Sequence, residues 1–310
     1  MERTFEIYLE SGGKSKSTCR HYGVYIDDFL QYLNREGVAP FEASPTDIMS
    51  FMKVLQLRKL SNATRSIRLG VIKQYYGWLL SEGVRSDNPA EHIWIRGAKR
   101  RKLHNILEPH ELERLYVEYP EPKEDDPRKN SNWYPYYLLS KRRNKAVLSL
   151  LIHQGVTTPE IARITLGDLQ LREGRIIIRG SRKGNERSLD LKPNQIMLLM
   201  EYQYQVREKL LTFQEDPTDQ LFLPTPVVGR NKASKSLQIF KGLTKELQQL
   251  EPQFENFKQV RASVITHWIK HYNLREVQYM AGHRYISSTE SYLVHHLEDL
   301  KDDIDKFHPF

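Results

Sequence analysis

The sequence predicts a mainly helical protein with one small β-sheet, arranged as two domains. Over most of the chain, apolar residues recur at spacings of three and four positions, which is the pattern of amphipathic helices. Two short runs in the second half, Arg175–Arg179 and Arg187–Leu191, have the composition and length of β-strands. The chain has 310 residues, which exceeds the usual size of one compact domain and favours two hydrophobic cores.

The composition indicates a globular protein with a polyanionic partner. Hydrophobic residues make up 39% of the chain and charged residues 28%, which excludes the disordered and membrane-embedded classes. The formal net charge of +8 favours nucleic acid over an anionic membrane surface, because each neutralised phosphate releases counterions. Cys19 is the only cysteine, so neither an internal disulfide nor a cysteine-based zinc site can form. Without a bilayer-spanning stretch or a signal peptide, we expect a cytoplasmic protein with no membrane partner.

Three helices are predicted in the N-terminal part of the chain. The first covers residues 17–33, where the apolar stripe begins. The second starts at Ser44-Pro45, since serine is a favoured N-cap and proline a favoured first helical residue. The third runs over residues 61–82 and ends at Gly83, a typical C-cap.

Basic residues in this part of the chain are candidates for contacts with DNA phosphates. Beside the stripe of the third helix lie Arg65, Arg68 and Lys73. Such a basic face is often only a solvated surface, but the net charge favours a role in DNA binding. After Asn88-Pro89, a basic run without apolar periodicity supplies three further candidates, Lys99, Arg100 and Arg101.

We place the domain boundary in this basic run. Residues 1–98 are then a helical DNA-binding domain, residues 99–107 a basic linker, and residues 108–310 a second domain. In the second domain, residues 145–154 are predicted to form a buried helix, and residues 119–135 a surface loop. The two strand-like runs are joined by a polar turn with Lys183 at its tip. From residue 194 onward, only helical periods recur.

The most informative segment covers residues 280–292 and reads MAGHRYISSTESY. A lone tyrosine in a chain with 17 tyrosines is usually a packed aromatic. Here, however, Gly282-His283 precedes Tyr292 by nine residues, and this spacing closely resembles the signature of tyrosine recombinases and phage integrases. The resemblance implies that Tyr292 is a nucleophile.

Two upstream motifs agree with this family in order and spacing. Lys258-x-x-Arg261 stands where the family carries His-x-x-Arg, so Arg261 matches and Lys258 is a departure. Lys183 lies in the sequence RKGNER, which resembles a family hairpin that carries a catalytic lysine. Residues 62–90 resemble the last helices of the integrase core-binding domain. The resemblance therefore implies a helical SAM-like core-binding domain followed by a mixed α+β catalytic domain.

One position breaks the family pattern. The first catalytic arginine of the family follows a Gly-Leu pair, as in GLRISEL, whereas this chain reads GVTTPEI over residues 155–161, with Thr157 in place of the arginine. Losing one preorganised donor slows such a reaction roughly a hundredfold to a thousandfold. Some integrases of Bacteroides-type mobile elements are similar in lacking this arginine. We therefore expect a substitute cation and name as candidates Arg163, Arg179 and Arg182.

The resemblance implies a complete mechanism. Tyr292 forms a 3′-phosphotyrosyl link, Arg261, Lys258 and His283 hold the phosphate, and Lys183 protonates the leaving 5′ oxygen. No cofactor or metal is expected, and the implied partner is double-stranded DNA, bound as two sites by a homotetramer, with accessory DNA-bending proteins. The bound protein would be nucleoid-associated, and the outcome would be integration or excision of a mobile element.

Three other interpretations are weaker. Thr157 is compatible with a catalytically impaired, recombinase-like DNA-binding accessory protein. A type IB topoisomerase shares the tyrosine chemistry, but the integrase-like N-terminal domain argues against it. His267 and His271 have a metal-compatible spacing of four residues, yet the sequence offers no third ligand nearby.

Overall fold

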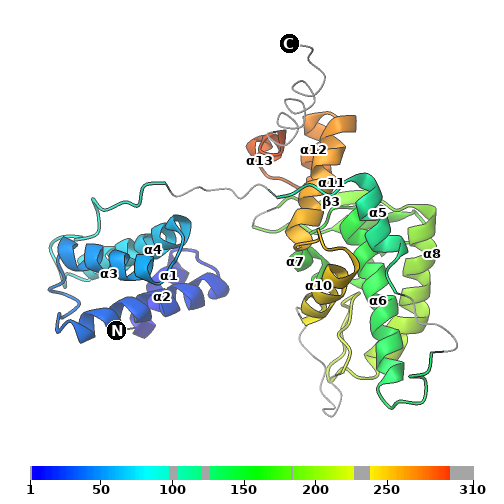
Figure 1. The fold of residues 1–310 in the computed structure, drawn as a ribbon, viewed down its shortest axis with the longest axis horizontal. Coiled ribbons are helices and arrows are strands. Elements are labelled where there is room, and N and C mark those ends of the chain that lie inside the picture. Colours follow the sequence, from blue (N-terminus) through cyan, green and yellow to red (C-terminus); the bar gives the residue numbers. More distant parts are fainter. Residues whose placement is uncertain (1, 98–103, 121–125, 183, 227–237, 294–310) are drawn as a thin grey trace. The chain divides into compact units, whose positions relative to one another are not determined.

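The chain folds as two compact units, Met1–Lys102 and Leu103–Phe310 (Figure 1). The computed structural model describes residues 2–97, 104–120, 126–182, 184–226 and 238–293. It is mostly helical with one three-stranded sheet, which confirms the predicted fold class. The predicted domain limits at residues 98 and 108 remain a prediction, and the linker cations Lys99, Arg100 and Arg101 lie outside the described residues. None of the helices among these residues is long and apolar enough to cross a membrane.

The first unit is a bundle of helices. Its helices are α1 (Glu2–Ser11), α2 (Lys16–Arg35), α3 (Pro45–Leu57) and α4 (Asn62–Ser81). Ser15, Ser44 and Ser61 are the N-caps of α2, α3 and α4, and each serine hydroxyl accepts a hydrogen bond from a backbone N–H of the first turn. The predicted helix at Ser44-Pro45 is confirmed, including its cap.

Helix α1 was not predicted from the sequence. It is ten residues long, and an isolated helix of that length is marginal in water. Tertiary packing stabilises it, because the ring of Phe5 lies 5.4 Å from Tyr75 and 5.6 Å from Trp78 of α4. The deeper core of the unit joins Phe29 of α2 to Phe51 of α3, with ring centroids 5.2 Å apart.

The second unit surrounds helix α6, which is buried along most of its length. Its first elements are α5 (Pro109–Val117), α6 (Tyr134–His153), α7 (Thr158–Ile161) and the short 3-10 turn η1 (Leu166–Asp168). Helix α6 begins at Tyr134 rather than at the predicted Lys145, and both Tyr119 and Tyr134 are buried. The predicted surface loop over residues 119–135 was therefore wrong at both ends, since these two rings anchor it on the core.

The sheet is antiparallel with the strand order β1-β2-β3. Its strands are β1 (Leu169–Gln170), β2 (Arg175–Ile178) and β3 (Arg187–Asp190). The predicted hairpin of β2 and β3 is confirmed, with Ile176 opposite Leu189 and Ile178 opposite Arg187. Because side chains alternate between the faces of a strand, Arg187 and Leu189 share the buried face of β3. A charged side chain thus lies in the core, next to the functional site.

The remaining elements are helical, as the periodicity predicts. They are α8 (Pro193–Glu201), the π-helical stretch η2 (Tyr202–Arg207), α9 (Glu208–Leu211), α10 (Gln238–Leu250), α11 (Phe257–His271), α12 (Leu274–Ala281) and α13 (Ile286–Glu290). In η2, the buried Arg207 donates hydrogen bonds to the carbonyl groups of Gln220 and Thr218, which holds the segment after α9 on the core. Figure 1 shows α11, α12 and α13 following one another next to β3 and α7.

Candidate active site

A cleft in the second unit brings together segments that are far apart in the sequence. It has a volume of about 460 Å³, and it is bounded by the start of α7, the turn after β2, the first turns of α11 and the turn after α12. Four of the predicted catalytic positions line it, namely Thr157, Lys258, Arg261 and His283. Lys183 lies outside the described residues, although its neighbours Ser181 and Gly184 also line the cleft.

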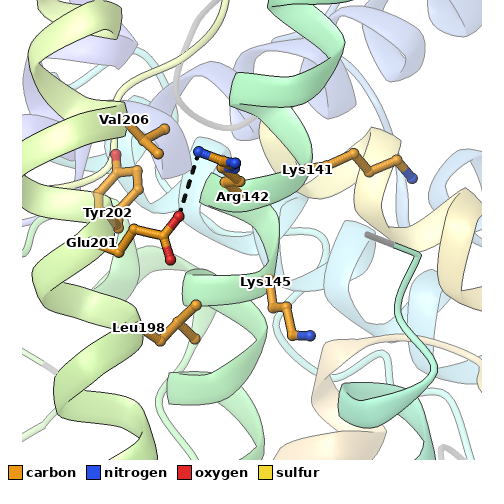
Figure 2. Close-up of a pocket in the computed structure, with 7 residues that line it drawn as sticks. All are labelled: Lys141, Arg142, Lys145, Leu198, Glu201, Tyr202 and Val206. Atoms are coloured by element: carbon orange, nitrogen blue, oxygen red, sulfur yellow. Dashed lines mark ion pairs between the residues drawn. The ribbon is translucent and has the colours of Figure 1, made fainter. Parts of the chain in front are cut away.

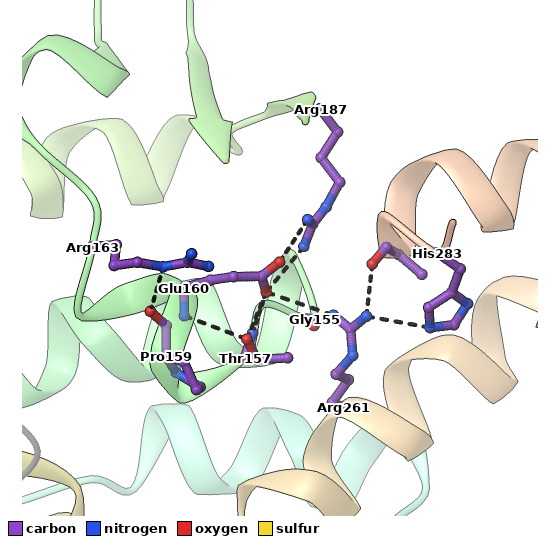
Figure 3. Close-up of polar contacts among 9 residues, drawn as sticks. Gly155, Thr157, Pro159, Glu160, Arg163, Arg187, Arg261 and His283 are labelled. Atoms are coloured by element: carbon purple, nitrogen blue, oxygen red, sulfur yellow. Dashed lines mark hydrogen bonds and ion pairs between the residues drawn. The ribbon is translucent and has the colours of Figure 1, made fainter. Parts of the chain in front are cut away.

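Arg261 is fixed in the cleft by backbone carbonyl groups. It lies in the second turn of α11, a helix whose N-cap Asn256 accepts hydrogen bonds from two backbone N–H groups. Its Nη1 donates to the carbonyl oxygen of Gly155 at 2.5 Å, and its Nη2 donates to that of Ala281 at 2.6 Å (Figure 3). The same Nη2 lies 3.3 Å from Nε2 of His283. The guanidinium is therefore oriented before any substrate arrives, as transition-state stabilisation by charge requires.

His283 follows a left-handed turn at the end of α12. Gly282 has a φ of 68° there and allows the chain to reverse without strain. The imidazole Nδ1 lies 2.9 Å from Oγ1 of Thr289 in α13. Burial, together with the charges of Arg261 and Arg187, lowers the pKa of His283 to about 4, so this histidine is neutral at neutral pH.

Tyr292 lies against both of these groups. Its ring is parallel to that of His283, with centroids 5.9 Å apart and 9° between the planes. Its other contacts are apolar, with the small cluster of Ile265 and Val277. Burial lowers the pKa of the Arg261 guanidinium, whereas the charge of Glu160 and, more weakly, an ionised Tyr292 raise it, so the phenol group lies within electrostatic reach of that guanidinium. The predicted nucleophile Tyr292, the arginine Arg261 and the histidine His283 therefore lie close together in the folded chain.

Thr157 has a structural role instead of a cationic one. It is the N-cap of α7, and its backbone N–H and hydroxyl donate to Oε2 of Glu160 at 2.7 Å and 2.8 Å. This reciprocal arrangement is a capping box. Lys258, in the first turn of α11, also lines the cleft and is exposed.

Arg187 is a residue that the motif comparison missed. Its side chain has no exposed surface, and its Nη1 donates to Oε1 of Glu160 at 2.8 Å (Figure 3). It also supports the turn before His283, because a Cβ atom at Gly282 would lie only 2.4 Å from Nη1 of Arg187. One signal in the sequence could have found it: strand alternation places this arginine on the same face as Leu189, and a buried charge requires a partner.

Glu160 connects the two arginines. Burial alone would raise the pKa of its carboxyl group, but the hydrogen bonds and charge of Arg187 outweigh this effect and lower the pKa to about 2. The nearest distance between Glu160 and Arg261 is 4.0 Å, so the carboxylate lies between two guanidinium groups. The cleft therefore contains a fixed, charged network at neutral pH.

Sequence profiles assign both units to one family. The profile of the phage integrase family matches residues 136–298, and that of the N-terminal SAM-like domain of phage integrases matches residues 2–85. The chain belongs to the phage integrase family. It is similar to the tyrosine recombinase XerD of Oceanobacillus iheyensis, with 30% identity over 100% of this chain and 98% of that protein. The chain is therefore a tyrosine recombinase.

Two solved structures share the recombinase fold at low identity. The integrase of the Tn1549 transposon, in complex with transposon right end DNA, has a TM-score of 0.64 and 13% identity, covering 99% of this chain and 98% of that chain. A lambda integrase tetramer bound to a Holliday junction has a TM-score of 0.61 and 14% identity, covering 92% and 76%. At this low identity, these two similarities establish only that the chain has the recombinase fold.

The candidates for a substitute cation in this recombinase occupy different places. Arg163 lines the cleft on the same wall as Thr157, and its Nε donates to the carbonyl oxygen of Pro159 at 3.1 Å. Arg179 pairs with Asp168 at 2.6 Å, and 63% of its side chain is exposed. Arg182 lies in the turn between β2 and β3. Among the described candidates, Arg163 is thus best placed to act on a substrate in the cleft.

The predicted DNA-binding cations of the first unit also make contacts within that unit. Arg65 donates to the side chains of Gln56 and Asn62, and Lys73 donates to a backbone carbonyl at 2.8 Å. Arg68 pairs with Asp28, which also accepts from a second arginine, Arg58. Their role in DNA binding stays a prediction.

A second hollow lies between α6 and the stretch formed by α8 and η2 (Figure 2). Two of its three cations are in ion pairs, with Arg142 at 3.4 Å from Glu201 and Lys141 at 3.0 Å from Glu246, and Lys145 lies over the ring of Tyr116. Within the part of the chain that the structure describes, no cluster of three or more His, Cys, Asp or Glu residues could hold a metal ion. His267 hydrogen bonds with the backbone carbonyl of Leu107.

We expect Glu160→Gln to lower the free energy of unfolding by about 3 kcal/mol at pH 7, because the variant leaves a buried guanidinium without its carboxylate. The ordinary pKa of this group is 4.5 and its pKa in the folded protein is about 2. Ionised Glu160 therefore stabilises the fold above pH 4.5, and this contribution disappears as the pH falls toward 2. Urea unfolding at several pH values should show the wild type and the variant converging below pH 4.5. Glu173→Gln, at an exposed site, is the control that should change little.

Proposed function

We propose that this protein is a site-specific DNA recombinase that cuts and rejoins DNA through a 3′-phosphotyrosyl intermediate on Tyr292. The observation that carries the proposal is the contact of His283 with both the Arg261 guanidinium and the ring of Tyr292. A nucleophile, a neutral imidazole and a fixed cation are the groups that phosphoryl transfer to a hydroxyl requires.

In the proposed cleavage step, the Tyr292 oxygen attacks the scissile phosphorus. A bond forms between that oxygen and phosphorus, and the bond from phosphorus to the 5′ oxygen of the next nucleotide breaks. Arg261 and Lys258 stabilise the charge on the non-bridging oxygens, and we assign Lys183 to protonate the departing 5′ oxygen. Since the phosphodiester energy is retained in the protein link, a free 5′ hydroxyl can reverse the step and reseal the strand.

The proposed substrate is double-stranded DNA, and the proposed assembly is a homotetramer on two sites. The net charge of +8 supports an anionic partner. The lambda integrase tetramer on a Holliday junction shares the fold and supports this assembly. We also propose accessory DNA-bending proteins and a location on the nucleoid when DNA is bound.

The proposed biological outcome is integration or excision of a mobile element. A transposon integrase shares the fold over nearly the whole chain, and the departures at Thr157 and Lys258 set this sequence apart from the family pattern. We propose that it is similar in function to integrases of Bacteroides-type mobile elements. The similarity to XerD makes resolution of chromosome dimers the competing outcome.

A second candidate function rests on Thr157. If Arg163 did not replace the missing arginine, the protein would act as an accessory that binds DNA and cleaves it poorly. We propose instead that Arg163 is the substitute, because it lines the same wall of the cleft within two turns of Thr157.

Wild-type protein should be trapped covalently on a nicked target site, because the fragment next to the nick diffuses away and prevents resealing. Tyr292→Phe should bind the site and give no adduct. Tyr285→Phe, a matched change at an exposed tyrosine in the same segment, should trap like the wild type. Denaturing gel electrophoresis measures the adduct, and an adduct in the Tyr292→Phe variant would remove this residue as the nucleophile.

Replacing Arg163 by Ala should slow single-turnover cleavage about a hundredfold and leave DNA binding intact, because a donor to the transition state is lost. Thr157→Arg should give little gain in the wild-type background and should restore cleavage to the Arg163→Ala variant. Thr157→Ala removes the α7 cap without adding charge and controls for the loss of that cap. Strong activation by Thr157→Arg alone would favour the impaired accessory protein.

Exchanging Lys99, Arg100 and Arg101 for Gln should weaken DNA binding and flatten its dependence on salt. The slope of log affinity against log salt should fall by about 0.9 for each lost phosphate contact. Exchanging Arg65, Arg68 and Lys73 for Gln should likewise weaken binding and reduce the slope, because we expect these helical residues to contact phosphates. Titrations at several salt concentrations measure the slopes, and an unchanged slope would assign that group of residues to the solvated surface.

A further inference from the structure

Thr289 connects the predicted nucleophile to the histidine of the cleft. It lies in α13 and has no exposed surface. Its Oγ1 is 2.9 Å from Nδ1 of His283, and its backbone carbonyl accepts a hydrogen bond from the N–H of Tyr292 at 3.0 Å. One buried residue therefore contacts both groups through different atoms.

The surroundings of His283 select one of its two neutral tautomers. The guanidinium of Arg261 has donors and no acceptor, and its Nη2 faces Nε2 at 3.3 Å, so Nε2 must accept. The remaining proton is then on Nδ1. That N–H points at the hydroxyl of Thr289, which can accept it, whereas a side chain without an oxygen could not.

Lys258 makes this tautomer important for the reaction. It occupies the position at which the family motif carries a histidine, and a lysine ammonium has three donors and no lone pair. It can stabilise a phosphate, but it cannot accept a proton from a tyrosine. Among the described residues that line the cleft, the bare Nε2 of His283 is a neutral acceptor next to the stacked ring of Tyr292.

We propose that Thr289 is a positioning residue that holds His283 in the Nδ1–H tautomer, so that Nε2 takes the proton of Tyr292 as it attacks. This inference rests on the proposed recombinase function and deepens it, and it makes His283 a base in place of the phosphate contact that the family resemblance implies. When the phosphate binds, Nη2 of Arg261 turns its N–H from Nε2 to a non-bridging oxygen, which frees the Nε2 lone pair. During the step, the bond between the Tyr292 oxygen and phosphorus forms, the phenol proton moves to Nε2, and the bond from phosphorus to the 5′ oxygen breaks. The imidazolium keeps its Nδ1–H bond to Thr289, and the 5′ oxygen receives its proton from a separate donor, Lys183.

The charges around His283 suit a base that gains strength only when DNA is bound. Arg261 from α11, Arg187 from β3 and Glu160 from α7 face it, with Tyr292 stacked on the ring, and burial together with the excess of cations keeps its pKa near 4. A phosphodiester bound at Arg261 adds a negative charge and raises the pKa of the imidazole. Proton acceptance is thus coupled to the presence of substrate.

The tautomer can be measured without any reaction. Long-range ¹H–¹⁵N correlation spectra of the DNA-free protein distinguish a protonated ring nitrogen from a bare one. In the wild type and in Thr289→Ser, which keeps the hydroxyl, Nδ1 should carry the proton and Nε2 should be bare. Thr289→Val should shift the population toward the other tautomer. A protonated Nε2 in the wild type, or an unchanged spectrum in the Val variant, would overturn the proposal.

A matched control is available in α11. Thr266 has no exposed surface, and its Oγ1 has no hydrogen-bond partner. Thr266→Val is therefore the same buried exchange without the loss of a hydrogen bond. It should leave the spectrum of His283 and the rate of cleavage unchanged, which separates the effect of the Thr289 hydroxyl from a general effect on packing.

Single-turnover cleavage then assigns the direction of proton transfer. Thr289→Val should slow cleavage of a nicked site on the order of tenfold to a hundredfold, and Thr289→Ser should recover most of the rate. A substrate with sulfur at the 5′ bridging position needs no proton on its leaving group, so the defect of the Val variant should persist with it. Rescue by sulfur would overturn the proposal, because His283 would then serve the leaving group.

The spectra and the cleavage assay together distinguish a failure of this inference from a failure of the proposed recombinase function. Covalent trapping of the wild type together with the wrong tautomer would overturn the role of Thr289 alone. If the wild type formed no adduct with either substrate, both the recombinase function and the proton transfer would fall, and the spectra would report the tautomer independently.

Discussion

The buried ion pair between Glu160 and Arg187 is the interaction on which the site depends. Glu160 caps α7 through Thr157 and binds a guanidinium that has no exposed surface. Arg187 extends from the inward face of β3 to the turn at Gly282, where no Cβ atom would fit. Because an unpaired buried charge is strongly destabilising, sheet, α7 and the turn after α12 must form together. The cleft walls are positioned by this pair.

The same network sets the charge that a substrate meets. Arg187 and Arg261 carry two positive charges, Glu160 carries one negative charge, and His283 is neutral because its pKa is near 4. The inner cleft therefore has one excess positive charge, which matches the single negative charge of a phosphodiester. The exposed Lys258 adds a second cation at the rim, where charge can develop on the non-bridging oxygens during attack. This balance of charge suits the phosphodiester of the proposed substrate.

The sequence predicted the parts of the site that have a fixed spacing along the chain. The segment from Gly282 to Tyr292 and the position of Arg261 were identified by their motifs, and the structure places these side chains in contact. Arg187 was missed because its role depends on a contact with Glu160, which is distant in the sequence. Thr289 was missed because its role depends on burial against His283, and a spacing pattern does not show burial. Helix α1 was missed for a related reason, since its stability comes from packing on α4 rather than from its own propensity.

If Arg163 takes the place of the family's arginine, as proposed, the positive charge moves from the interior of the cleft, at Thr157, to its rim. The inner wall already holds two guanidinium groups around one carboxylate, so a third cation there would be repelled by the other two until a phosphate binds. Arg163 is exposed, and its charge is hydrated in the free protein. Covering the cleft with DNA removes that water, and the interaction of the arginine with a phosphate then strengthens severalfold as the local dielectric constant falls. A rim cation is therefore compatible with a stable free protein and becomes effective only in the complex, where the chemistry takes place.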